Sequence, residues 1–137
     1  MGRVMVEIEV ANHRDVLFAE AGTLPSEKVR RMRVSGVVDG GANWLVLPET
    51  VAARLGLPSS GVCTVHYADG RSATRPMVGD LQVELLGRHG NFGAIVEPDR
   101  TTALIGAIVL EHMDLLVDCA KQALVPRDPN QIIAEVE

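Results

Sequence analysis

The sequence has few aromatic residues, few cysteines and no long apolar run. Its 137 residues include one Trp, one Tyr, two Phe and two Cys. Cys63 and Cys119 are too few for a disulfide scaffold, and such scarcity is typical of a reducing compartment. We therefore expect a cytoplasmic protein. No apolar run reaches the roughly 18 residues that a membrane helix needs, so we expect no membrane partner.

Acidic residues outnumber basic ones, with 18 Asp and Glu against 13 Lys and Arg and a formal net charge of -5. This balance disfavours nucleic acid as a partner. Hydrophobic residues make up 47% of the chain. Because so few are aromatic, the core must consist of Val, Leu and Ile, which favour strands. The length predicts one domain; we assign residues 1–126 to it and residues 127–137 to a polar C-terminal tail.

Alternating apolar residues predict strands in the first third of the chain. The residues that share one face of the segment VMVEIEVAN are Val4, Val6, Ile8 and Val10. The alternation returns across residues 28–38 and ends in two valines before Asp39, as expected for a strand that becomes buried on both sides. Residues 12–15 are interpreted as a turn and residues 16–22 as a returning strand.

Short helices and hairpins are predicted in the remainder. Pro48, Gly56 and Pro58 frame one short helix, and a helical pattern precedes Met113. The expected hairpin turns are residues 68–71, which carry an Asp-Gly pair, and residues 88–91; residues 114–126 are expected to form two closing strands. The sequence thus predicts a mainly β fold with one or two short helices.

The segment VVDGGANWLVLP, residues 37–48, places an ionisable carboxylate between an apolar strand and two glycines. Burying such a group is costly unless it has a partner or a chemical role. Asp-Gly is also common in hairpin turns, so the four residues around Asp39 leave both a turn residue and a catalytic acid open. Cys63 and His66 have a spacing found in metal sites, but on a strand they point to opposite faces. We expect no metal site and no cofactor.

Three segments together resemble the retroviral-type (retropepsin-like) aspartic protease family, in its bacterial and archaeal branch. VVDGGANWLVLPETVAARLGL is similar to that family's apolar strand, Asp-Thr/Ser-Gly-Ala turn and following segment. VHYADGRSA resembles the flap hairpin, and ALIGAIVLEHMDLLVDCAKQALVP resembles the motif of two apolar residues and a glycine with its short helix and final strands. The resemblance covers residues 28–126 and implies a closed, mostly antiparallel acid protease barrel.

The resemblance also implies an aspartic endopeptidase with half an active site per chain. In the family, two aspartates share a proton and activate a water molecule against a peptide carbonyl. This sequence has one Asp-x-Gly-Ala segment, so the implied enzyme is a homodimer in which each chain contributes Asp39. The implied partners are a second copy of the chain and a peptide or protein substrate.

By the same resemblance, the turn and the flap bind substrate, and residues beneath the turn support the acid. The residues implied in substrate binding are Gly41, Ala42, Tyr67, Ala68, Asp69 and Gly70. Those implied in supporting the site are Gly40, Ile105 and Gly106. The residues alone leave a plain turn at 41–42 and an ordinary surface hairpin at 67–70 open. Trp44 is expected to anchor the core or an interface.

Gly40 departs from the family pattern, which has Thr or Ser at this position. The family's hydroxyl forms a hydrogen bond across the dimer beneath the two aspartates, and Gly40 has no side chain that could form it. Each lost hydrogen bond costs about 1 kcal/mol. The alternative function is therefore a catalytically weakened or inactive dimer of the same fold that acts as a peptide-binding module.

Overall fold

The computed structural model describes residues 3–137, and the chain is mainly β. Strands account for 47% of the chain. The strands are β1 (Val4–Asn12), β2 (Arg31–Val38), β3 (Val46–Pro48), β4 (Ser59–His66), β5 (Ser72–Leu85), β6 (Arg88–Glu97), β7 (Ala103–Ile105), β8 (Leu115–Asp118) and β9 (Ala123–Pro126). The helices are α1 (His13–Glu20), the 3-10 helix η1 (Ser26–Lys28), α2 (Glu49–Leu55) and α3 (Ala107–Met113).

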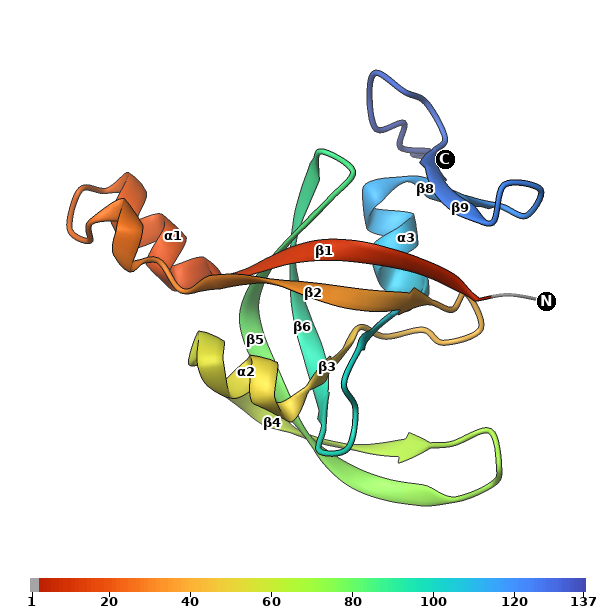
Figure 1. The fold of residues 1–137 in the computed structure, drawn as a ribbon, viewed down its shortest axis with the longest axis horizontal. Coiled ribbons are helices and arrows are strands. Elements are labelled where there is room, and N and C mark those ends of the chain that lie inside the picture. Colours follow the sequence, from red (N-terminus) through yellow and green to blue (C-terminus); the bar gives the residue numbers. More distant parts are fainter. Residues whose placement is uncertain (1–2) are drawn as a thin grey trace.

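Six strands close into a barrel in the order β1-β2-β7-β3-β6-β5, because β5 also pairs with β1. The expectation of a closed β barrel is confirmed. Its pairings are antiparallel except for β2–β7 and β3–β6, which are parallel. β4 lies outside this ring and pairs with β5, so the two strands extend beyond the barrel as a long hairpin (Figure 1).

Aliphatic side chains fill the barrel, as the shortage of aromatic residues predicts. The largest fully buried side chains include Ile8, Leu45, Leu47, Leu81 and Ile105. Burial of each such side chain contributes about 1.5–3 kcal/mol. The strand at residues 4–12 is also as predicted, with Val4, Ile8 and Val10 facing the interior.

The first helix was not predicted, and the assignment of residues 16–22 to a returning strand is wrong. Asn12 is the N-cap of α1, and its side-chain oxygen accepts a hydrogen bond from the Asp15 N–H at 3.1 Å. An Asn followed three residues later by an acid is typical of a helix start, which the turn interpretation overlooked. Leu17 and Phe18 are half exposed on this helix, so they did not give a core-facing helical pattern.

The turn between β5 and β6 lies at Leu86 and Gly87, and its prediction at residues 88–91 is wrong. Both residues have positive φ, 52° and 77°, which is the geometry of a two-residue hairpin turn. Leucine rarely adopts this geometry, so no local pattern marked a turn at these residues. Gly90 lies inside β6, where an added Cβ would be 2.7 Å from the Phe92 ring.

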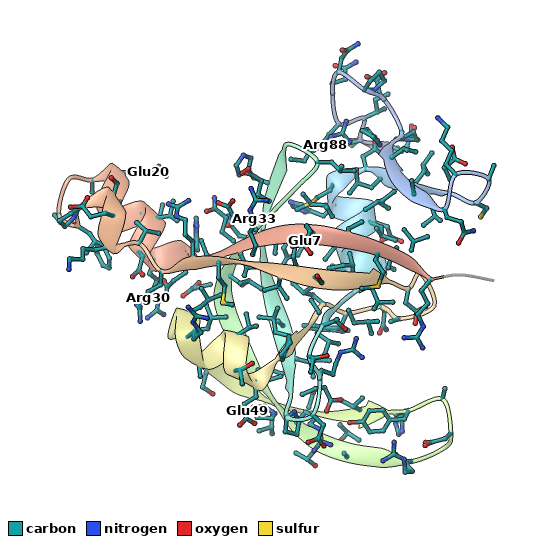
Figure 2. All side chains as sticks on the ribbon, in the orientation of Figure 1. Glu7, Glu20, Arg30, Arg33, Glu49 and Arg88 are labelled. Atoms are coloured by element: carbon teal, nitrogen blue, oxygen red, sulfur yellow. The ribbon has the colours of Figure 1, made fainter. Side chains whose placement is uncertain are left out.

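The C-terminal segment forms a separate hairpin, β8–β9, beside α3 (Figure 1). The tail after β9 has no regular secondary structure but is bonded to the rest of the chain. The Arg88 guanidinium, labelled in Figure 2, donates to the backbone carbonyls of Met113, Asp114, Asp128 and Gln131. The Ile133 N–H and the Arg127 side chain lower the pKa of the Asp114 carboxyl. None of the helices within residues 3–137 has the length and apolarity needed to cross a membrane.

An ion pair at the base of α1 predicts a pH-dependent stability. The Asp15 carboxylate accepts hydrogen bonds from the backbone N–H and the guanidinium of Arg30, which lies beside α1 in Figure 2. The side-chain hydrogen bond from Arg30 lowers the pKa of Asp15 below its ordinary value of 3.8. Because the folded-state pKa is depressed, the contribution to stability is present above pH 3.8 and is lost as pH falls through the lowered pKa.

Asp15→Asn removes this ion pair and is therefore expected to lower the free energy of unfolding at pH 7. The expected loss is only about 1–2 kcal/mol, because solvent screens the half-exposed Arg30. The difference from wild type should shrink below pH 3.8. Urea titrations at several pH values measure it. Asp99→Asn is the control, because within residues 3–137 the Asp99 carboxylate forms no ion pair. A difference independent of pH would contradict the assignment.

Candidate active site

Asp39 follows β2 in a tight turn that is fixed by backbone hydrogen bonds. The Asp39 N–H donates to the Ile105 carbonyl at 3.0 Å, and the Ala42 N–H donates to the Asp39 carbonyl at 3.2 Å. The Gly41 N–H donates to Oδ1 of the Asp39 carboxylate at 2.9 Å. Within residues 3–137, Oδ2 has no hydrogen-bond partner, and the side chain is exposed in the single chain. The turn therefore presents one oriented carboxylate to solvent.

The support beneath this turn comes from the start of α3. The Ala107 N–H donates to the Ala42 carbonyl at 2.8 Å, and the Ile108 N–H donates to the Asn43 carbonyl at 3.1 Å. Gly106 immediately precedes Ala107, and a Cβ at Gly106 would be 2.2 Å from the Trp44 carbonyl oxygen. Only glycine allows the two backbone segments to approach this closely.

The β4–β5 hairpin reaches toward the Asp39 turn and is tied to the barrel at its tip. Tyr67 donates its hydroxyl to Oε2 of Glu97 at 2.6 Å. Nε of Arg75 donates to Oε1 of Glu97 at 2.5 Å and to the Tyr67 hydroxyl at 3.2 Å. The hydrogen bond to the Glu97 carboxylate, together with burial, raises the pKa of Tyr67. We call Tyr67, Arg75 and Glu97 the hairpin latch.

Two adjoining cavities, of about 540 and 560 Å³, lie between the turn and the hairpin tip. The residues that line both are Asp39, Tyr67, Ala68, Arg100 and Leu104. The first cavity has an apolar wall formed by Trp44, Val46 and Ile95. We call the two cavities together the cleft; the Asp39 carboxylate lies where they join.

The structure brings most of the predicted site residues together. Gly41, Ala42, Tyr67 and Ala68 line the cleft with Asp39. Ile105 is fully buried and supports Asp39 through its carbonyl. Asp69 and Gly70 lie at the exposed hairpin tip and are not among the residues lining the cleft. The N–H and guanidinium of Arg71 lower the pKa of Asp69.

Several residues that line the cleft were not predicted as site residues from the sequence, and three of them are polar or aromatic groups that bear on its chemistry. Glu97 is a buried acid at the end of β6, and Arg100 lies in the following connection. Trp44, predicted as an anchor in the core or an interface, is half-buried and lines the cleft. No local sequence pattern distinguishes Glu97 or Arg100 from the other charged residues, because their position depends on how β6 meets the hairpin.

The geometry offers no metal centre within residues 3–137, since no three His, Cys, Asp or Glu side chains gather there in a way that could hold an ion. Cys63 is half-buried on β4 and Cys119 is exposed, and neither is in a disulfide. The chain matches no protein-family model and no curated protein.

The hairpin latch predicts the mobility of the hairpin tip. Tyr67→Phe removes a hydrogen bond to a charged acceptor, an interaction worth about 1.5 kcal/mol or more. The amide protons of Tyr67 and Gly70, which close the turn, are expected to exchange about tenfold faster. Hydrogen–deuterium exchange measures this change. Ser72→Ala, which removes the exposed hydrogen bond to His66 in the same hairpin, is the control. Equal exchange in wild type and Tyr67→Phe would show that the latch does not hold the tip.

Proposed function

We propose that the protein is a retropepsin-like aspartic endopeptidase that acts as a homodimer, with one Asp39 from each chain. The observation that carries the proposal is the Asp39 carboxylate itself. It is held by the Gly41 N–H on one oxygen, it is free on the other, and it lies in the cleft beside a projecting hairpin. The closed barrel and the order of these elements support the same assignment.

Under this proposal a second chain is needed, because no second available acid lies in the cleft among residues 3–137. Glu97 is the other carboxylate in the cleft, but Tyr67 and Arg75 already bind both of its oxygens. A carboxylate engaged in this way cannot share a proton with Asp39 or hold a water molecule with it. A second Asp39 turn, related by two-fold symmetry, supplies the missing acid.

In the proposed mechanism, the two Asp39 carboxyl groups share one proton, because two close carboxylates do not both ionise readily. The ionised group takes a proton from a water molecule as the water oxygen attacks the peptide carbonyl carbon. The protonated group donates a hydrogen bond to the carbonyl oxygen. The tetrahedral intermediate then breaks the C–N bond as a proton passes to the amide nitrogen, giving a carboxylic acid and an amine.

Substrate would lie in the cleft in an extended conformation. The hairpin and the Asp39 turn offer backbone groups on either side, and pairing of an extended peptide with such edges is a common recognition mode. Trp44, Val46 and Ile95 provide an apolar wall for a substrate side chain. The Tyr67 and Ala68 backbone would close over the bound peptide.

The terminal strands are the candidates for holding the dimer. β8 pairs with β9 in a two-stranded sheet outside the barrel, and Leu116 and Val117 on β8 are exposed. Open strand edges that carry exposed apolar side chains tend to pair with another chain. Sedimentation equilibrium measures the resulting mass.

Mixing of subunits tests the shared site. Wild-type and Asp39→Asn chains, refolded together in equal amounts, are expected to retain about a quarter of the activity of the same total amount of wild type, because only wild-type pairs carry both acids. Chains that act independently would retain about half. A retained activity of one quarter supports one shared site per dimer, and a retained activity of one half contradicts it.

Gly40 favours a second candidate function, an inactive dimer of this fold that binds peptides without cutting them. A Cβ added at Gly40 meets no atom within 4 Å, so a threonine fits in the single chain. Under the main proposal, both wild type and Gly40→Thr cleave peptides. If wild type binds peptides without cleavage and Gly40→Thr gains cleavage, the natural protein is a disabled protease that acts as a binding module.

A further inference from the structure

Arg100 occupies a central position in the cleft. It lies between β6 and β7 and lines both cavities beside Asp39. It also borders a third cavity of about 210 Å³ at the hairpin latch. Its side chain is half-buried, so its positive charge is partly removed from solvent at the place where a peptide would lie.

The Arg100 guanidinium is held by neutral oxygens of its own loop. Nε donates to the Thr102 carbonyl at 2.9 Å, and Nη2 lies 3.3 Å from the Thr102 hydroxyl and 3.5 Å from the Ala103 carbonyl. Within residues 3–137, Nη1 has no hydrogen-bond partner and no carboxylate forms an ion pair with the group. The side chain is oriented, and its charge is uncompensated.

The basic side chains of the hairpin are already paired, whereas the Asp39 and Asp99 carboxylates, which border the same cavities as Arg100, form no ion pair within residues 3–137. Arg75 is bonded to Glu97, and Arg71 is bonded to Asp69. His66 is hydrogen-bonded to Ser72. Arg3 also borders the cleft, but it is exposed. Among the other arginines that border the three cavities, Arg100 is therefore the one whose half-buried guanidinium forms no ion pair with a carboxylate.

We infer that Arg100 binds the carboxylate of an acidic side chain in the peptide, so that the cleft selects substrates with Glu or Asp near the bond addressed by Asp39. This inference rests on the proposed function for the cleavage it describes. A guanidinium prefers a carboxylate because it donates two N–H bonds in a matching plane. The selected peptide pairs this acidic residue with an apolar residue on the wall at Trp44, Val46 and Ile95.

The overall charge of the protein does not provide this preference. The chain carries a formal net charge of -5, and a field of that sign repels acidic peptides at long range. Preference for an acidic side chain must therefore come from a local contact, and it should disappear when that contact is removed.

Cleavage of a peptide library tests the inference. The probe is a set of random octapeptides in which each position in turn is fixed as Glu, Gln or Lys. At one position, wild type should show about tenfold higher kcat/KM for Glu than for Gln, as expected for one charge-assisted contact. In Arg100→Gln that ratio should fall to about one. Arg33→Gln is the matched control for charge, since Arg33 lies on β2 away from the hairpin tip (Figure 2), and it should keep the wild-type ratio.

A binding experiment separates this inference from the proposed function. Fluorescence anisotropy with the same peptides, labelled, is measured on Asp39→Asn and on Asp39→Asn with Arg100→Gln. If Asp39→Asn binds Glu peptides preferentially and the double variant does not, the role of Arg100 is supported even if wild type cuts no peptide. In that case, the endopeptidase proposal fails while the inference about Arg100 stands.

Four outcomes overturn the inference. The first is cleavage with equal rates for Glu and Gln peptides, which would leave the proposed function intact. The second is a Glu preference that Arg100→Gln retains. The third is absence of binding to any library peptide. If Arg100→Gln instead dissociates the dimer in sedimentation equilibrium, Arg100 contacts the second chain and the assignment to substrate is wrong.

Discussion

Asp39→Asn is expected to lower kcat/KM for peptide hydrolysis by about 10⁴-fold or more, with the fold retained. Asparagine has the shape of aspartate, and its side-chain oxygen can still accept the Gly41 N–H bond made by Oδ1. It cannot take a proton from water or share one with a second acid. Because each chain supplies the residue, one substitution removes both acids of the proposed dimer. Losses of this size are typical when groups that act as a unit are removed.

Cleavage of fluorogenic peptides measures this effect, and circular dichroism with sedimentation equilibrium checks the fold and the mass. Asp80→Asn is the matched control. Asp80 pairs with Arg14 at the exposed end of the molecule near α1, away from the cleft, so its loss should leave hydrolysis unchanged. Retained cleavage in Asp39→Asn would contradict the assignment of the acid.

Gly106→Ala is expected to be the most damaging small substitution in the barrel, with a loss of about 3 kcal/mol or more in the free energy of unfolding. The new Cβ would be 2.2 Å from the Trp44 carbonyl oxygen and 2.8 Å from the Ala42 carbonyl oxygen. Both are backbone atoms, and Ala42 is held there by the Ala107 N–H. Relief of the clash requires the Asp39 turn and α3 to separate.

Gly40→Ala, in the Asp39 turn that Gly106 supports, provides the comparison. Its Cβ meets no atom within 4 Å, so we expect a change of no more than about 0.5 kcal/mol. Denaturant unfolding of the two variants measures both. Equal stability of Gly106→Ala and wild type would show that the close approach is not required. Failure of Gly106→Ala to fold, with Gly40→Ala folding normally, agrees with the prediction.

The strands that were predicted correctly are those in which every second side chain faces the barrel interior. β1 shows the pattern directly, because Val6, Ile8 and Val10 alternate with Glu7 and Glu9. The short helix α2 was predicted from its C-terminal Gly56, which adopts a left-handed conformation with φ of 61°. Such local signals depend only on residues that are close together in the sequence, so a single sequence is enough to recognise them.

Features set by tertiary contacts were not predictable in the same way. α1 projects from the barrel with Leu17 and Phe18 half exposed (Figure 1), so no buried face marked it as a helix. In the cleft, Asp39, Gly41 and Tyr67 were predicted because motifs carry them. Glu97 was not, since its contact with Tyr67 joins residues 30 positions apart, and a single sequence gives no signal for such a pair.

The insertion of β7 between β2 and β3 determines when the chain can complete its fold. β7 is the last strand of the barrel to be synthesised, and it carries both the Ile105 carbonyl that fixes Asp39 and the link to Gly106. A nascent chain that stops before residue 103 holds the other barrel strands but leaves a gap in the wall. Closure therefore depends on contacts between distant segments, which is typical of slow folding. Until β7 is in place, the Asp39 turn lacks its hydrogen bond to the Ile105 carbonyl.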